Sequence, residues 1–131
     1  MMNFVYLIAP IFMITLDLIW IGLNKTMYKR MVENVQHSKL KFRITSAVIA
    51  YCAMIISLTL FVIPAALKDP SKNNVYKALK YGASHGFIIY TIYNATNFAV
   101  FENYPLDVAV IDTIWGTTVY FLSTLFALYL Y

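Results

Sequence analysis

Four long, predominantly apolar stretches dominate this sequence and constrain its fold more than any other feature. They cover about residues 2–23, 44–67, 79–101 and 108–130. A helix needs about 20 apolar residues to cross the hydrocarbon core of a bilayer, and each stretch has about that length. We therefore expect a single domain, residues 1–131, with an all-α polytopic membrane fold. The expected architecture is a compact bundle of four transmembrane helices with both termini on the same side.

The composition excludes a soluble or disordered chain. Hydrophobic residues make up 61% of the sequence and charged residues 12%, against about 45–50% and about 25% in soluble domains. A soluble fold of 131 residues would have to bury nearly all of this apolar surface, yet small domains bury the smallest fraction of theirs. Chains rich in aromatic residues and poor in charge do not stay unfolded in water. The composition thus favours an integral membrane protein.

The basic residues indicate a lipid partner and not a nucleic acid. The net charge is +4, and all ten Lys and Arg residues fall within 25–43 and 68–80, between the apolar stretches. Basic residues beside membrane spans commonly face anionic lipid headgroups. We therefore expect membrane lipids as partners and no nucleic acid. The charges on the two sides differ by too little to decide which side is cytoplasmic.

Polar side chains from three of the predicted helices fall at one depth. Asp17 and Asp112 lie roughly 10 and 8 Å inside the same end of the bundle, and Asn97 and Asn94 lie roughly 8 and 12 Å inside it, from the rise of a helix. Such a layer predicts a polar pocket within the membrane. Its candidate members are Asp17, Trp20, Tyr90, Tyr93, Asn94, Thr96, Asn97, Asp112 and Trp115.

Small residues recur at helical spacing on the faces that we expect to meet inside the bundle. Gly82, Gly86 and Gly116 are candidate helix-packing residues, because small side chains let two backbones approach closely in a membrane. The second apolar stretch carries a similar face, made of Ser46, Ala50, Ala53 and Ser57. These faces predict close packing of all four helices around the polar layer.

Two motifs near the polar layer resemble a known family. They are Tyr90-x-x-Tyr93-x-x-Thr96-Asn97 and, after Pro105, Asp112-x-x-Trp115-Gly116. They resemble an uncharacterised, mainly bacterial family of small four-helix membrane proteins, a domain of unknown function. Further positions of the same resemblance are Asp17, Trp20, Tyr28, Pro64, Gly82 and Gly86. The resemblance implies a fold and a site but no activity, and Asn94 stands where the family usually carries Asp, which weakens any mechanism that needs three carboxylates.

The intramembrane aspartates leave three functions open. An unpaired Asp costs about 2.5–3.5 kcal/mol inside a bilayer, so each needs a hydrogen-bonding partner or a ligand. The first hypothesis is a pocket that binds or moves an amphiphile or an ion. Under this hypothesis we expect a homo-oligomer, because four short helices enclose little volume. The second hypothesis is a structural or accessory subunit of a larger membrane complex, including a viral or organelle membrane. The third is a small lipid-modifying enzyme.

Enzymatic activity is the least favoured of the three. The sequence contains no hydrolase elbow, phosphate-binding loop, dinucleotide fingerprint or zinc signature. Cys52 is the single cysteine, which excludes an intramolecular disulfide and a cysteine-based metal cluster. We therefore expect no cofactor and no metal.

Overall fold

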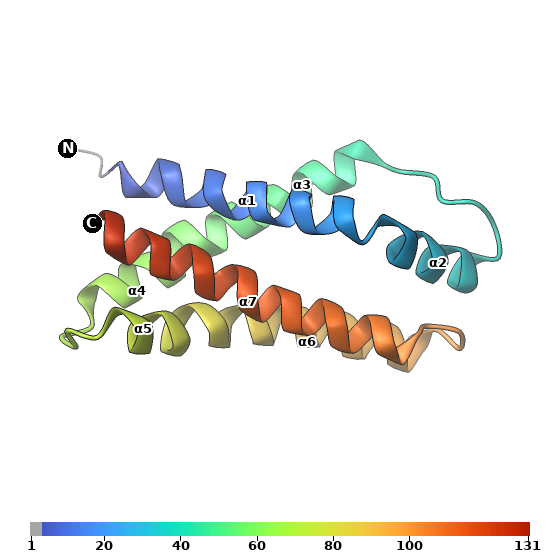
Figure 1. Cartoon of the computed structure of the whole chain (residues 1–131). Coiled ribbons are helices and arrows are strands. Elements are labelled where there is room, and N and C mark those ends of the chain that lie inside the picture. The colour runs from blue at the N-terminus through green and yellow to red at the C-terminus, as the bar shows by residue number, and fades with distance from the viewer. Residues whose placement is uncertain (1–3) are drawn as a thin grey trace.

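The computed structural model describes residues 4–131, and this part of the chain is helical, without a β-strand. Two π-helical segments, Ser57–Val62 and Ala78–Ala83, join shorter helices into continuous ones. Four long helices therefore run side by side, with a shorter helix, α2, at one end (Figure 1). The elements are α1 (Val5–Leu23), α2 (Lys25–Gln36), α3 (Ile44–Ile56), α4 (Ile63–Lys68), α5 (Asn74–Lys77), α6 (Ser84–Val100) and α7 (Leu106–Leu130).

Three of the long helices have the length and hydrophobicity to cross a membrane. They are α1, the continuous helix Ile44–Lys68 and α7. The fourth, which runs from Asn74 to Val100, includes polar residues such as Lys80 and Asn94 that lower its hydrophobicity. It begins before the predicted start at residue 79, because the Asn73 side chain caps it by accepting a hydrogen bond from the Tyr76 N–H at 3.0 Å. Residues 2–3 of the first predicted stretch lie outside the described residues.

The continuous helix Ile44–Lys68 packs against its neighbours along only one half. Its second half buries Leu58, Val62 and Ile63, whereas α3 contributes no buried residue. The π-helical segment between the halves directly precedes Pro64 and its neighbour Ile63. Proline cannot donate a backbone hydrogen bond, and a wider turn before it relieves the mismatch. The sequence predicts that the small-residue face of α3 packs closely against another helix. The structure contradicts this prediction, because α3 contributes no buried residue.

The helices α6 and α7 are held close together by glycines. A Cβ atom added at Gly86 would collide with the backbone carbonyl of Gly116, and one added at Gly116 would collide with the ring of Tyr90. At Gly82, a Cβ would collide with the Thr124 hydroxyl group and lie 2.7 Å from the Tyr120 carbonyl oxygen. The three glycines therefore lie where the backbone of one helix meets the other.

The largest fully buried side chains belong to a core centred on α7. Tyr120 and Val119 of α7 pack with Met13 of α1 and Leu58 of the first π-helical segment. The Tyr120 hydroxyl group lies 2.6 Å from Ser57 Oγ, so the buried phenol has a hydrogen-bonding partner. The rings of Phe12 and Phe126 stack with centroids 4.2 Å apart, which ties α1 to the last turns of α7.

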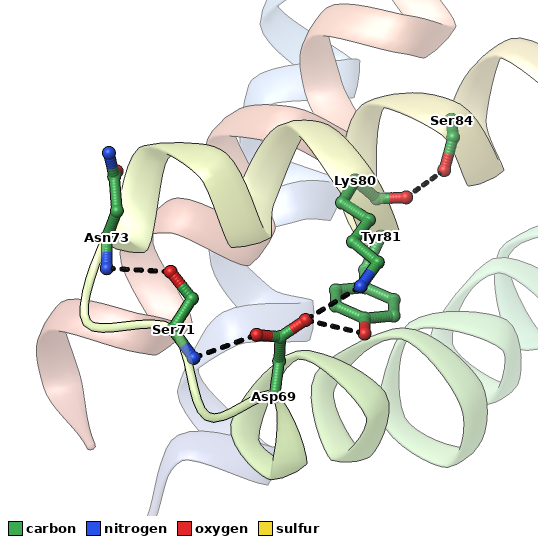
Figure 2. Close-up of polar contacts among 6 residues, drawn as sticks. All are labelled: Asp69, Ser71, Asn73, Lys80, Tyr81 and Ser84. Carbon is green, nitrogen blue, oxygen red and sulfur yellow. Dashed lines mark hydrogen bonds and ion pairs between the residues drawn. The ribbon is translucent and has the colours of Figure 1, made fainter.

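A polar cluster closes the turn between α4 and α5, at the same end of the bundle as the C-terminus (Figures 1 and 2). The Asp69 carboxylate accepts hydrogen bonds from Lys80 Nζ at 2.9 Å, the Ser71 N–H at 2.9 Å and the Tyr81 hydroxyl group at 2.8 Å. These donors, the Lys80 ammonium foremost, lower the pKa of Asp69 from 3.8 to about 2. The cluster fixes where the chain turns back into α5.

The lowered pKa of Asp69 predicts a pH-dependent contribution to stability. The ionised carboxylate stabilises the fold fully above its unfolded pKa of 3.8, and this stabilisation is lost as the pH falls toward about 2. The thermal midpoint of the wild type should therefore exceed that of Asp69→Asn by a constant amount above about pH 5. The difference should shrink below pH 4. A difference that stays constant down to about pH 2 would contradict the assignment.

Candidate functional site

Asp17 occupies the buried face of α1 and joins three helices. Its side chain follows Met13 by one turn on that face, and the residue is only 6% exposed. One carboxylate oxygen accepts a hydrogen bond from the Tyr51 hydroxyl group of α3, and the other accepts one from Trp115 Nε1 of α7, both at 2.8 Å. Both oxygens thus have neutral donors, and neither is paired with a basic side chain.

Asp112 of α7 is also held by two neutral hydrogen-bond donors. Its carboxylate accepts hydrogen bonds from the Tyr28 hydroxyl group of α2 at 2.6 Å and from Asn94 Nδ2 of α6 at 2.7 Å. Asn94 is 2% exposed, and its own oxygen accepts a hydrogen bond from the Tyr104 hydroxyl group at 2.8 Å. Asn94 therefore connects Asp112 to the loop between α6 and α7.

A stacked tryptophan pair bridges the two aspartates. The rings of Trp20 and Trp115 lie nearly parallel, with centroids 4.5 Å apart and an angle of 4° between their planes. Trp115 donates to Asp17, and Trp20 Nε1 donates to the Tyr28 hydroxyl group at 2.9 Å. Because Tyr28 in turn donates to Asp112, hydrogen bonds and one aromatic contact connect both carboxylates.

Four other predicted members of the pocket, Tyr90, Tyr93, Thr96 and Asn97, are not among the described donors to the two carboxylates. Tyr90 contributes its backbone carbonyl, which accepts from Asn94 Nδ2 at 3.0 Å, while its ring covers Gly116. Tyr93 is 56% exposed and Thr96 is also exposed. The Asn97 side chain is partly buried, and neither it nor Thr96 hydrogen-bonds to Asp17 or Asp112. The motif around residues 90–97 therefore contributes to the network mainly through Asn94.

Three tyrosines complete the network, although sequence reasoning did not place them in it. They are Tyr28, Tyr51 and Tyr104. Nothing in the spacing distinguishes Tyr51 and Tyr104 from the other tyrosines, whereas Tyr28 was among the residues that carried the family resemblance. Burial, reinforced by the adjacent Asp112 carboxylate, raises the pKa of Tyr28, so this phenol remains a neutral hydrogen-bond donor.

A cavity of about 690 Å³ lies between α3 and the rest of the bundle. Both Asp17 and Asp112 line it, together with Ala47, Ala50 and Ala53 on the loosely packed α3. The described residues that line it include no Lys, Arg or His. Six tyrosines also contribute to the lining: Tyr28, Tyr51, Tyr90, Tyr93, Tyr104 and Tyr120.

The donor set of this site does not resemble a metal centre. Within residues 4–131, no three His, Cys, Asp or Glu side chains are grouped as a metal ion would require. The two carboxylates are instead hydrogen-bonded by hydroxyl, amide and indole groups. The arrangement can therefore hold negative charge beside an apolar space.

Comparison with known proteins assigns a family but no activity. The model of a family described as "Predicted membrane protein (DUF2177)" matches residues 2–129, nearly the whole chain. No curated protein and no solved structure shows a significant match. The family match confirms the resemblance to uncharacterised membrane proteins that the sequence indicated.

Proposed function

We propose that this chain, which belongs to the DUF2177 family of predicted membrane proteins, spans the membrane four times and binds an amphiphile in the cavity lined by Asp17 and Asp112. The fourth span is the helix from Asn74 to Val100, which packs along α7 in spite of its lower hydrophobicity. Its most buried polar residue, Asn94, is hydrogen-bonded inside the bundle. Four spans agree with Figure 1, where the C-terminus and the start of α1 lie at the same end.

The observation that carries the proposal is that Asp17 and Asp112, which lie on two different hydrophobic helices, line one cavity. Its volume, about 690 Å³, is within the range of about 300–1,000 Å³ that is usual for small-molecule pockets. Intramembrane acidic residues commonly mark the path or site of a bound molecule. Apart from the carboxylates and the tyrosine hydroxyl groups, the lining is mostly alanine and larger apolar side chains. A polar end beside an apolar space matches an amphiphile.

Photocrosslinking of the full-length protein in nanodiscs tests this function. The probe is a monoacylglycerol, a neutral single-chain amphiphile, with a diazirine in its acyl chain, and we expect crosslinks at Ala50, Met54 and Ile89, which line the cavity. Ala53→Trp should abolish these crosslinks by filling the cavity. The matched control is Ile49→Trp, because Ile49 is 65% exposed and does not line the cavity. Equal labelling of wild type and Ala53→Trp would refute the proposal.

A purely structural role is the second candidate, and one observation favours it. All four carboxylate oxygens of Asp17 and Asp112 already accept hydrogen bonds from the protein. Such interhelical hydrogen bonds can fix helix positions in a membrane without any ligand. In that case Asp112→Asn should alter thermal stability or assembly while leaving crosslinking in the cavity unchanged. Loss of the crosslinks at an unchanged thermal midpoint would instead support the binding function.

A further inference from the structure

The charge around the cavity is unbalanced, and this imbalance indicates the headgroup that it accepts. Asp17 and Asp112 both line the space, while the described residues of its wall include no basic side chain. The ion pairs in the described part of the chain involve other carboxylates: Lys29–Glu33, Arg30–Asp107 and Lys80–Asp69. A cationic group in the cavity would therefore balance the negative charges of Asp17 and Asp112, which no described basic side chain of the wall balances.

The hydrogen bonds to the carboxylates stabilise negative charge without neutralising it. Tyr28, Tyr51, Trp115 and Asn94 each donate one hydrogen bond to a carboxylate oxygen. A carboxylate has about four lone-pair sites, so two donors leave acceptor capacity on each group. An ammonium group can use that capacity, whereas a sulfate or phosphate would be repelled by the same charge.

The aromatic lining points to the same class of headgroup. Tyr90 and Tyr93 of α6 and Tyr51 of α3 line the cavity that contains the two aspartates. The face of a phenol ring attracts a cation, and groups of aromatic rings are a common means of binding quaternary ammonium groups. These rings attract a cation in addition to the attraction that the carboxylate charges provide.

The weakly packed α3 provides room for an acyl chain. None of its residues is buried, and Ala47, Ala50 and Ala53 face the cavity with small side chains. Met54, which also lines the cavity, is an adaptable apolar contact. A volume of about 690 Å³ suits one drug-sized molecule. The lining of the cavity therefore combines carboxylate and aromatic groups with small and flexible apolar side chains.

We propose that the cavity binds an amphiphile with an ammonium headgroup, which lies between Asp17 and Asp112 while its chain lies along α3. This inference rests on the proposed binding function and adds the charge of the ligand. The protein would discriminate by charge, since neutral and anionic amphiphiles of the same chain length gain the apolar contacts but not the electrostatic ones.

Competition against the diazirine probe in nanodiscs of neutral lipid tests the proposal. The competitors share one chain: dodecyltrimethylammonium, dodecyl maltoside and dodecyl sulfate. We expect the cationic competitor to displace the probe at a concentration about tenfold or more below the neutral one, from its ion pairing and cation–π contacts. Asp17→Asn and Asp112→Asn should each remove most of this preference. The control Asp107→Asn changes an exposed carboxylate, paired with Arg30, and should leave the preference unchanged.

A second variant tests the headgroup without disturbing the hydrogen-bond network. Tyr93 lines the cavity but is 56% exposed, so Tyr93→Leu should preserve the fold while reducing the cationic preference. Tyr129→Leu, at a 71% exposed position away from the cavity, is its matched control. Equal competition by cationic and neutral amphiphiles in the wild type would overturn the ammonium assignment and leave the binding function standing. Absence of any crosslink in the cavity would overturn both.

Discussion

Gly86→Ala is expected to destabilise the protein by about 1–3 kcal/mol, which is the usual cost of overpacking a close contact. The added Cβ would collide with the backbone carbonyl of Gly116 and lie 2.9 Å from the Cβ of Tyr120. A backbone carbonyl cannot rotate away as a flexible side chain can, so α6 and α7 would have to separate. The loss should exceed the roughly 0.5–1 kcal/mol that alanine gains over glycine in a helix interior.

The sequence contains a matched control for this experiment. Gly22 lies in the last turn of α1, and a Cβ added there would meet nothing within 4 Å. Gly22→Ala should therefore leave the free energy of unfolding unchanged or raise it slightly. Denaturation in mixed detergent micelles, followed by circular dichroism, measures both variants. Equal stability of Gly86→Ala and Gly22→Ala would show that α6 and α7 are not in close contact at Gly86.

Trp115→Phe should destabilise the network around Asp17 more than Trp20→Phe does. Phenylalanine preserves an aromatic ring in the stack but removes the indole N–H that donates to Asp17 Oδ1 at 2.8 Å. A buried carboxylate oxygen would lose its partner, at a cost of about 1–3 kcal/mol or more for a charged group. The Asp17 residue is only 6% exposed, so solvent compensates for little of the lost hydrogen bond.

Trp20→Phe removes the same ring area as Trp115→Phe but no hydrogen bond to a carboxylate. The difference in stability between the two variants therefore measures the contribution of the hydrogen bond to Asp17. Trp20 donates to the neutral hydroxyl group of Tyr28, which keeps its own hydrogen bond to Asp112. The expected cost is that of one ordinary hydrogen bond, about 0.5–1.5 kcal/mol. The same denaturation assay measures both variants. Equal losses would indicate that stacking, and not the charge on Asp17, determines the contribution of Trp115.

The polar layer is the part of the site that could be predicted from the sequence. Helical rise placed Asp17, Asp112 and Asn94 at one depth, because depth along a membrane helix depends only on residue count. The structure bonds Asn94 directly to Asp112, and it links Asp17 to Asp112 through Trp115, the stacked Trp20 and Tyr28. Thr96 and Asn97 lie at similar depths but do not bond to the carboxylates, since depth does not specify which face of a helix meets the others.

The tyrosine donors show what could not be predicted. Tyr51 reaches Asp17 only because α3 lies beside α1 at that level, and Tyr28 reaches Asp112 only because α2 lies against α7. Both contacts depend on how elements far apart in the sequence are placed laterally. The small-residue face of α3 is expected to pack closely, yet it lines a cavity instead, because α3, which precedes the π-helical segment, buries none of its residues against the neighbouring helices.

The sequence by itself determined that this chain is a helical membrane protein, since apolar segment length and composition leave a chain of this kind few alternatives. Only the tertiary structure decided that the two aspartates share one cavity and which side chains donate to them. The physical reason is that hydrophobicity orients a helix along the membrane normal, whereas side-chain packing sets its rotation and its neighbours.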